Sequence, residues 1–168
     1  MTGRALLRPA LLAGIAAAAP TFGQAPTSRY DDPQTCSRLL ASGEGASLPT
    51  AAHRLCVIAI ASTYIDAEEN SIPPERQLLA DDVSRHMVGK QADFKAGNAR
   101  KIIADNSHAV IGAIKNRQWV VDGNQAWILY DGYLKSDPSK PGFNVAERLT
   151  IEHGLIKEIL VAAVARPQ

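Results

Sequence analysis

The stretch between Phe143 and Ala163 most constrains the fold, because its residues alternate in polarity on both sides of a glycine turn. Apolar residues occupy every second position, which predicts strands with one face in a core and the other in water. Strands over 143–152 and 155–163, joined by a tight turn at His153-Gly154, would form a β-hairpin. The inward row of the first strand reads Phe143, Val145, Glu147, Leu149 and Ile151.

One charged residue, Glu147, interrupts this inward row. An isolated carboxylate is too costly to bury, so it either meets a partner or stays protonated. We therefore expect Glu147 to belong to a polar site inside the protein. The alternatives are a pair with a neighbouring lysine or arginine, or an outward orientation if the face assignment is shifted by one residue.

The rest of the chain predicts helices first and strands afterwards. Ser47 and Pro49 are typical of a helix start, and apolar residues at helical spacing follow them. The expected elements are a helix over 48–69, a short helix over 75–79, a turn at 81–82, a strand over 83–87, a helix over 97–105, strands from 109 to 117 or 121 and over 125–134, and a loop over 136–142.

This order predicts an α+β fold, in which N-terminal helices pack on the concave face of a curved antiparallel sheet. A curved sheet covered by helices is a usual place for a small apolar ligand, so we expect a pocket of cone or barrel shape. The sequence supports the sheet more directly than it supports the pocket.

The N-terminus has the order of a secretory signal. Arg4 and Arg8 precede the apolar run 11–19, which is too short to span a bilayer, and small residues follow at 23–25. We expect cleavage between Ala19 and Ala25, a secreted or periplasmic protein, and no membrane association after cleavage. Residues 1–25 are then the signal peptide, 26–46 a linker or N-terminal arm, and 47–168 the folded domain.

Export gives a role to the two cysteines, since disulfides persist in oxidising compartments. Cys36 and Cys56 would close a loop of about twenty residues, worth roughly 3 kcal/mol in the chain-entropy model. Two unpaired thiols, one of them buried, are the alternative.

Composition and motif searches exclude several classes. A net charge of +1 argues against a nucleic-acid-binding protein. The histidines lack metal-ligand spacing, and neither a glycine-rich phosphate loop nor a nucleophile elbow occurs. The sequence therefore predicts no metal and no cofactor. The four histidines are His53, His86, His108 and His153.

Four short motifs, together spanning about residues 50–164, resemble the SnoaL-like, nuclear-transport-factor-2-like superfamily, which includes ketosteroid isomerase, scytalone dehydratase and polyketide cyclases. They are fold markers and not catalytic signatures. The motifs are Thr63-Tyr64-Ile65-Asp66-Ala67, Leu79-Ala80-Asp81-Asp82-Val83, Val121-Asp122-Gly123-Asn124 and the hairpin run 147–156.

Ketosteroid isomerase has a cystatin-like fold of cone shape, and the resemblance to it implies a candidate site. Tyr64 and Glu147 fall where that family has a tyrosine and a protonated acid that hold an oxyanion. The position of the family's base aspartate is taken by Met87, and the adjacent His86 is the candidate proton carrier. Steroid isomerisation as such is therefore not expected.

Aromatic residues on the expected strands are candidates for the ligand pocket or for a subunit contact. Both faces of 125–134 are apolar enough to be covered, so one face would line the core or pocket and the other would form a homodimer through the sheet. Simple core packing of these aromatic residues is the alternative. The candidate ligand-binding residues are Trp119, Trp127, Tyr130, His108 and Met87.

Two function classes remain open from the sequence. One is an isomerase- or dehydratase-like enzyme acting on a small apolar carbonyl or hydroxy compound, with Tyr64 and Glu147 as oxyanion donors. The other is a non-catalytic ligand-binding or dimerisation module of the same fold. The sequence does not decide between them.

Overall fold

The computed structural model describes residues 29–70, 72, 76–88 and 110–166. Within these residues, helical segments come before strands, so the expected α+β class is confirmed. The elements are α1 (Pro33–Ala41), the 3₁₀ helix η1 (Glu44–Ser47), α2 (Thr50–Glu69), β1 (Leu79–Met87), β2 (Ile111–Asp122), β3 (Gln125–Leu134), β4 (Asp137–Glu152) and β5 (Leu155–Ala165).

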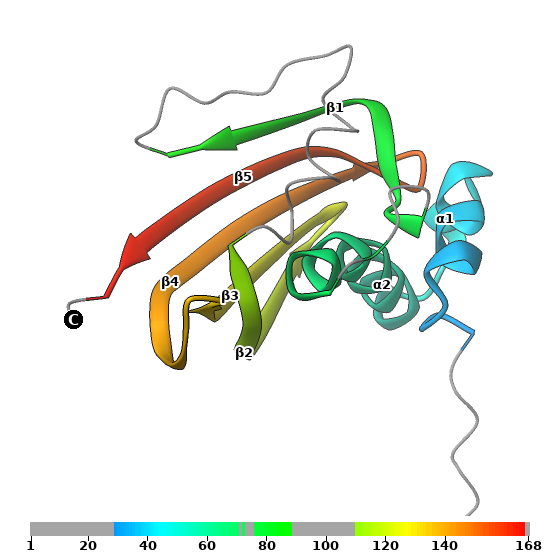
Figure 1. The fold of residues 1–168 in the computed structure, drawn as a ribbon. Coiled ribbons are helices and arrows are strands. Elements are labelled where there is room, and N and C mark those ends of the chain that lie inside the picture. Colours follow the sequence, from blue (N-terminus) through cyan, green and yellow to red (C-terminus); the bar gives the residue numbers. More distant parts are fainter. Residues whose placement is uncertain (1–28, 71, 73–75, 89–109, 167–168) are drawn as a thin grey trace, which may run out of the picture.

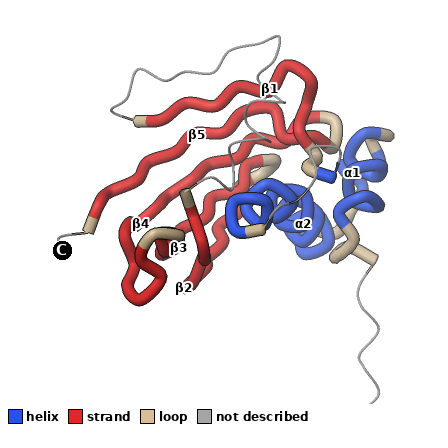
Figure 2. The backbone as a smooth tube through the Cα atoms, in the orientation of Figure 1, coloured by secondary structure: helices blue, strands red, loops and turns tan. Residues whose placement is uncertain are grey.

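The strands form a single open sheet in the order β1-β5-β4-β3-β2. It curves around α2, which lies in its concavity, while α1 packs beyond α2 at one end (Figures 1 and 2). Neighbours from β2 to β5 are antiparallel, as expected, but β1 pairs with β5 in parallel, which makes the sheet mixed. Hairpins impose antiparallel pairing on β2 to β5, whereas no hairpin sets the direction of β1.

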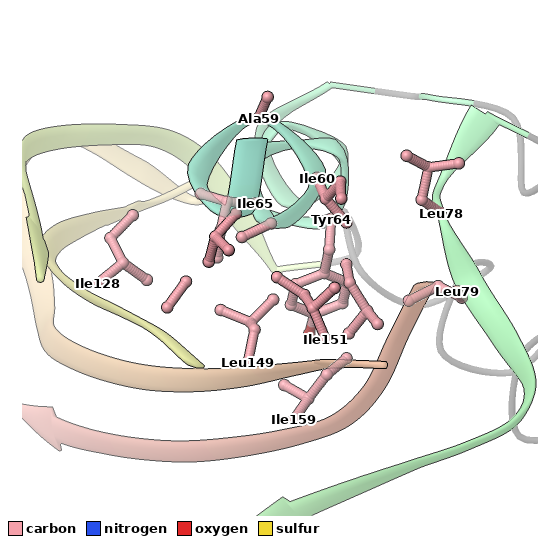
Figure 3. Close-up of a cluster of buried hydrophobic side chains, with 14 of the residues drawn as sticks. Ala59, Ile60, Tyr64, Ile65, Leu78, Leu79, Ile128, Leu149, Ile151 and Ile159 are labelled. Carbon is pink, nitrogen blue, oxygen red and sulfur yellow. The ribbon is translucent and has the colours of Figure 1, made fainter. Parts of the chain in front are cut away.

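The long helix α2 begins within two residues of its predicted start. Pro49 occupies the N-cap position, and Ser47 belongs to η1, so Ser47 does not cap α2. Most of the apolar residues of α2 are buried, because the helix is covered by the curved sheet on one side and by α1 on another. In Figure 3, Tyr64 points from α2 toward the sheet, where Leu149 and Ile151 pack beside it.

The hairpin that organises the sequence is present as predicted. Val145, Glu147, Leu149 and Ile151 are all buried on the concave face, and the intervening residues are not. His153 and Gly154 both have positive φ angles, +47° and +76°, as a two-residue hairpin turn requires. The predicted inward orientation of Glu147 is therefore confirmed.

The first strand is longer than expected. Arg76 has 3₁₀ geometry, but Gln77 and Leu78 are not helical and Leu79 already belongs to β1, so the predicted helix over 75–79 is wrong from Gln77 onward. Asp81-Asp82 lies within the bounds of the strand. The parallel pairing with β5 contains an irregularity between Leu79 and Ser84, and Asp82 forms an ion pair with Lys157 of β5. The two aspartates thus lie in the irregular part of β1, between the two stretches that pair with β5.

Two other segments also differ from the expectation. Asp137 begins β4, so the predicted loop over 136–142 is mostly strand. The arm over 26–46 contains α1, which is capped by the Asp32 side chain accepting from the Thr35 amide, followed by η1. The predicted signal peptide, the helix over 97–105 and His108 lie outside the described residues.

A disulfide joins Cys36 of α1 to Cys56 of α2, so the predicted pairing is confirmed. Both cysteines are fully buried. The bond therefore holds α1 against α2, the helix that lies in the concavity of the sheet. Among the described helices, none combines the length and apolar character that crossing a membrane would require.

Candidate functional site

The candidate site begins with Glu147, whose side chain lies on the concave face of β4 and is 1% exposed. Its neighbours in the same strand row are the apolar Val145 and Leu149. The Oε1 atom lies 2.8 Å from the hydroxyl oxygen of Tyr130. The buried Oε2 atom has no hydrogen-bond partner among the residues that the structure describes. A buried polar atom without a partner is rare in a native protein and calls for an explanation.

Tyr130 brings β3 into the site. Ile128, two residues earlier on the same face, pairs with Glu147 across the β3–β4 ladder, which places the Tyr130 ring beside this carboxyl. The Tyr130 hydroxyl also lies 2.6 Å from Oε2 of Glu68 on α2. One buried phenol therefore links a carboxyl on a strand to a carboxyl on the helix.

Tyr64 and Glu68 are one helical turn apart on α2, so their side chains share the face that meets the sheet. The Tyr64 hydroxyl donates to Oε1 of Glu68 over 3.1 Å. Tyr64 and Glu147, the pair singled out in the sequence, are thus brought into one cluster. They are connected through Glu68 and Tyr130, because the Tyr64 hydroxyl proton is used by Glu68.

Arg85 supplies the positive charge of the site. It lies on the same face of β1 as the buried Val83, and its positive charge acts on Tyr64, Glu68 and Glu147. Its Nε atom is buried and has no hydrogen-bond partner within the described part of the chain. The five residues that we call the polar cluster are Tyr64, Glu68, Arg85, Tyr130 and Glu147.

Burial controls the protonation of the two carboxyls. Desolvation and the nearby charge of Glu68 raise the pKa of Glu147 well above its usual range, although Arg85 and the Tyr130 hydrogen bond act in the opposite direction. Desolvation also raises the pKa of Glu68, against the hydrogen bond from Tyr130, the charge of Arg85 and the hydrogen bond from Tyr64. Glu147 is therefore the carboxyl more strongly held in its neutral form.

The phenols and the guanidinium keep their ordinary charge states. Desolvation, together with the neighbouring carboxyls, raises the pKa of both Tyr64 and Tyr130, so both phenols are neutral. Burial by itself would lower the pKa of Arg85, but interactions with Tyr64 and the two carboxyls outweigh it and raise that pKa. Arg85 is the cation of the cluster.

Other residues singled out in the sequence lie elsewhere. His86 occupies the face of β1 opposite Arg85, because successive strand side chains alternate, so its role as proton carrier stays a prediction. Met87 and Trp119 are half-buried and pack against the core. Trp127 lies on the outer face of the sheet, where the Arg148 guanidinium stands 5.8 Å from its ring centroid.

Two members of the polar cluster, Glu68 and Arg85, were missed by sequence reasoning. Glu68 had a usable signal, since it lies four residues after Tyr64 in a helix that was predicted to be buried. Arg85 had a weaker signal: it lies two residues after Val83 in a short predicted strand, so the two side chains were expected on the same face. Among the described residues, no group of three histidine, cysteine, aspartate or glutamate side chains is arranged to hold a metal ion.

A family model described as "Domain of unknown function (DUF8021)" matches residues 50–162. No curated protein matches the sequence.

Several solved structures have a similar fold. An NTF2-like protein of unknown function from Cytophaga hutchinsonii aligns with a TM-score of 0.51 and 11% identity, over 64% of this chain and 89% of that one. A "putative ketosteroid isomerase" from Kribbella flavida aligns with a TM-score of 0.53 and 15% identity, over 67% and 80%. A protein of unknown function with a cystatin-like fold from Methylobium petroleophilum aligns with a TM-score of 0.53 and 17% identity, over 68% of this chain and 80% of that one. These likenesses establish the NTF2-like fold that the sequence motifs predicted.

Proposed function

The chain belongs to the family described as Domain of unknown function (DUF8021) and has the NTF2-like fold; from its polar cluster we propose that it binds a small apolar carbonyl or hydroxy compound and moves a proton on it without a cofactor. The similar protein from Kribbella flavida carries an isomerase description, which is consistent with this class of chemistry. The two sequences are only 15% identical, so the support for the proposal comes from the residues of this chain.

The observation that carries the proposal is the free Oε2 atom of Glu147, buried in an otherwise apolar row. A neutral carboxyl offers one acceptor oxygen and one hydroxyl donor. Such a group in a site of low dielectric constant stabilises negative charge that develops on a ligand oxygen. The positive charge of Arg85 acts in the same direction, because it favours a bound anion.

The roles within the proposed site follow from the hydrogen bonds. Glu147 is the group that we assign to the ligand oxygen, since its Oε2 atom has no hydrogen-bond partner among the described residues and lies on the concave face of the sheet. Tyr64 acts through Glu68, to which its hydroxyl donates, and therefore positions the cluster. Tyr130 holds Glu147 in place and connects it to Glu68.

Binding of para-nitrophenol tests the proposal, because this probe carries an oxygen that ionises with a visible change in absorbance. We expect Glu147→Gln combined with Tyr64→Phe to weaken its binding at least about tenfold, the loss of one good hydrogen bond to a charged oxygen. Glu69→Gln is the matched control, since Glu69 pairs with Arg117 outside the cluster. Unchanged affinity in the double variant would remove the support for a ligand at Glu147.

A non-catalytic module of the same fold is the second candidate, favoured by the apolar outer face of the sheet. Val120 pairs with Trp127 on that face, and Leu129 lies next to them, with 48% of its surface exposed. A second copy of this chain is the occupant that we propose for this surface.

We also propose that the protein is exported to an oxidising compartment. The Cys36–Cys56 disulfide supports this, because such bonds are rare in the reducing cytosol. The N-terminal sequence of the secreted or periplasmic protein should begin between residues 20 and 26. A product found only in the cytosol and still carrying residues 1–25 would contradict export.

A further inference from the structure

If both carboxyls of the polar cluster were ionised, the cluster would have too few protons for the two short contacts of the Tyr130 hydroxyl. The Tyr130 oxygen lies 2.6 Å from Glu68 and 2.8 Å from Glu147, both within hydrogen-bond range. A phenol has one proton to donate, so it can donate to only one of these carboxyls. The second contact needs a proton on the other carboxyl, which then donates to the Tyr130 oxygen.

The hydrogen-bond partners indicate which carboxyl holds this proton. Glu68 accepts from Tyr64 at one oxygen and lies closer to Tyr130 at the other, which favours its ionised form. Within the described part of the chain, Glu147 has a hydrogen bond with Tyr130 only, and burial raises its pKa the more strongly of the two. Neutral Glu147 therefore donates from Oε1 to Tyr130, and Tyr130 donates to ionised Glu68.

We infer that Glu147, Tyr130 and Glu68 form a proton relay, in which Glu147 exchanges a proton with the bound ligand at Oε2 and Glu68 is the base that finally stores it. This inference rests on the proposed function for the position of the ligand. It goes further because it assigns the base to Glu68, a residue that does not touch the ligand.

Each transfer in the relay balances. A ligand X–H bond breaks and its proton binds Oε2 of Glu147, while the proton on Oε1 passes to the Tyr130 oxygen. The original hydroxyl proton of Tyr130 passes to Oε2 of Glu68. Glu147 and Tyr130 end neutral as they began, Glu68 becomes neutral, and the ligand becomes an anion. The reverse sequence returns a proton to the ligand, at the same atom or at another.

The positive charge of Arg85 is balanced by one negative charge both before and after the proton transfer. Before transfer, Arg85 balances the Glu68 carboxylate, and after transfer it balances the ligand anion. Among the described residues, the groups around the relay include Tyr64 from α2 and Arg85 from β1, and the apolar Ile128 of β3 and Val161 of β5, which pair with Glu147. No net charge is created in the buried site, so the transfer avoids the cost of an unpaired ion.

Infrared spectroscopy of the ligand-free protein tests the shared proton, because a protonated carboxyl has a C=O stretch that a carboxylate lacks. At neutral pH we expect one such band from the buried cluster in the wild type, and we expect Glu147→Gln to abolish it. In Glu68→Gln the midpoint at which the band disappears should move to lower pH, since the like charge that opposes ionisation of Glu147 is gone. Glu69→Gln should leave band and midpoint unchanged.

Either of two results in the free protein would overturn the inference. One is a wild-type spectrum without this band at neutral pH, which would mean that both carboxyls are ionised. The other is a midpoint in Glu68→Gln equal to that of the wild type, which would mean that the two carboxyls do not share a proton. Circular dichroism of each variant establishes that it is folded.

The ligand half is tested with para-nitrophenol and Tyr130→Phe. In the wild type the bound probe should ionise, with a second C=O band that Glu68→Gln removes. In Tyr130→Phe the probe should bind but stay protonated, because the connection to Glu68 is broken. Equal ionisation in both proteins would overturn the relay. Failure of the wild type to bind the probe would instead contradict the proposed function, and the infrared spectra of the free protein would still decide whether the proton is shared.

Discussion

At the scale of single residues, Glu147 is tolerated inside an apolar row because its charge is removed. Desolvation is the main cause of its raised pKa, and the negative charge of Glu68 opposes ionisation of Glu147 further. In addition to the hydroxyl proton of Tyr130, the two carboxyls share one proton. The positive charge of Arg85 compensates the one carboxylate that remains. A buried acid in this setting is both a structural cost and a reactive group.

Glu147→Gln should reduce the pH dependence of the stability of the protein. The pKa of Glu147 is raised in the folded state, so folding binds a proton once the pH exceeds about 4.5, the value for an exposed glutamate. The stability that Glu147 contributes is complete below that pH and falls as the pH rises toward the folded-state pKa. Urea denaturation of the wild type should show a loss of up to about 1.4 kcal/mol per pH unit in this window.

In Glu147→Gln this slope should be smaller, because glutamine does not titrate and Glu68 is then the one carboxyl of the polar cluster with a raised pKa, whereas Glu69→Gln should keep the wild-type slope. Equal slopes in the wild type and Glu147→Gln would show that Glu147 is ionised in the folded protein.

At the scale of elements, contacts between distant segments set what local patterns leave open. The β4–β5 turn approaches α1 so closely that a Cβ atom on Gly154 would lie 2.1 Å from the Ser37 carbonyl oxygen. Glycine is therefore needed there for the positive φ angle and also for space. The Gly123 turn has a positive φ angle as well, with nothing within 4 Å of the same Cβ position.

Gly154→Ala should destabilise the protein more than Gly123→Ala. Both substitutions place alanine at a positive φ angle, which costs roughly 1 kcal/mol. Gly154→Ala additionally forces the turn away from α1, and we expect a total loss of about 2 to 4 kcal/mol. Denaturant unfolding of the two variants measures the difference. Equal losses would mean that α1 moves aside without cost.

The disulfide between α1 and α2 is a second contact of this kind. Replacing both Cys36 and Cys56 by serine should lower the free energy of unfolding by about 3 kcal/mol, because the twenty-residue loop is no longer closed in the unfolded chain. Wild-type protein unfolded under reducing conditions should lose a similar amount. If the serine variant is as stable as the oxidised wild type, packing by itself holds α1 in place.

At the scale of the whole molecule, the sheet has two different faces. The concave face buries α2 and the polar cluster, whereas the outer face leaves large apolar side chains in solvent: Val120, Trp127, Leu129 and Val164. An exposed apolar surface of this kind is typical of a protein–protein contact. The homodimer through the sheet stays a prediction that solution measurements decide.

Leu129→Lys should weaken a dimer formed through this face. Burying one leucine contributes about 1.5 to 3 kcal/mol, so placing a charge there should raise the dissociation constant at least about tenfold in sedimentation velocity. Leu55→Lys, on α2 with a similar exposed fraction, should leave it unchanged. A wild-type protein that sediments as a monomer at every concentration would contradict the dimer.

The sequence by itself determined the hairpin, the inward orientation of Glu147, the long buried helix and the α+β class. These follow from periodicity over neighbouring residues, which any chain with this alternation carries into its fold. It misjudged the start of β1, because Asp81 and Asp82 have a local turn tendency, whereas pairing with β5 on both sides of them extends the strand back to Leu79.

Only the tertiary structure decided how the site is assembled. Tyr130 contacts Glu68 from a position 62 residues along the chain and Glu147 from 17 residues away. Such contacts depend on the curvature of the sheet and on the register between β3 and β4, neither of which is encoded in the spacing of residues along one element. The identity of the inward acid was readable in the sequence, but its partners, and hence its protonation, were set by what the fold placed around it.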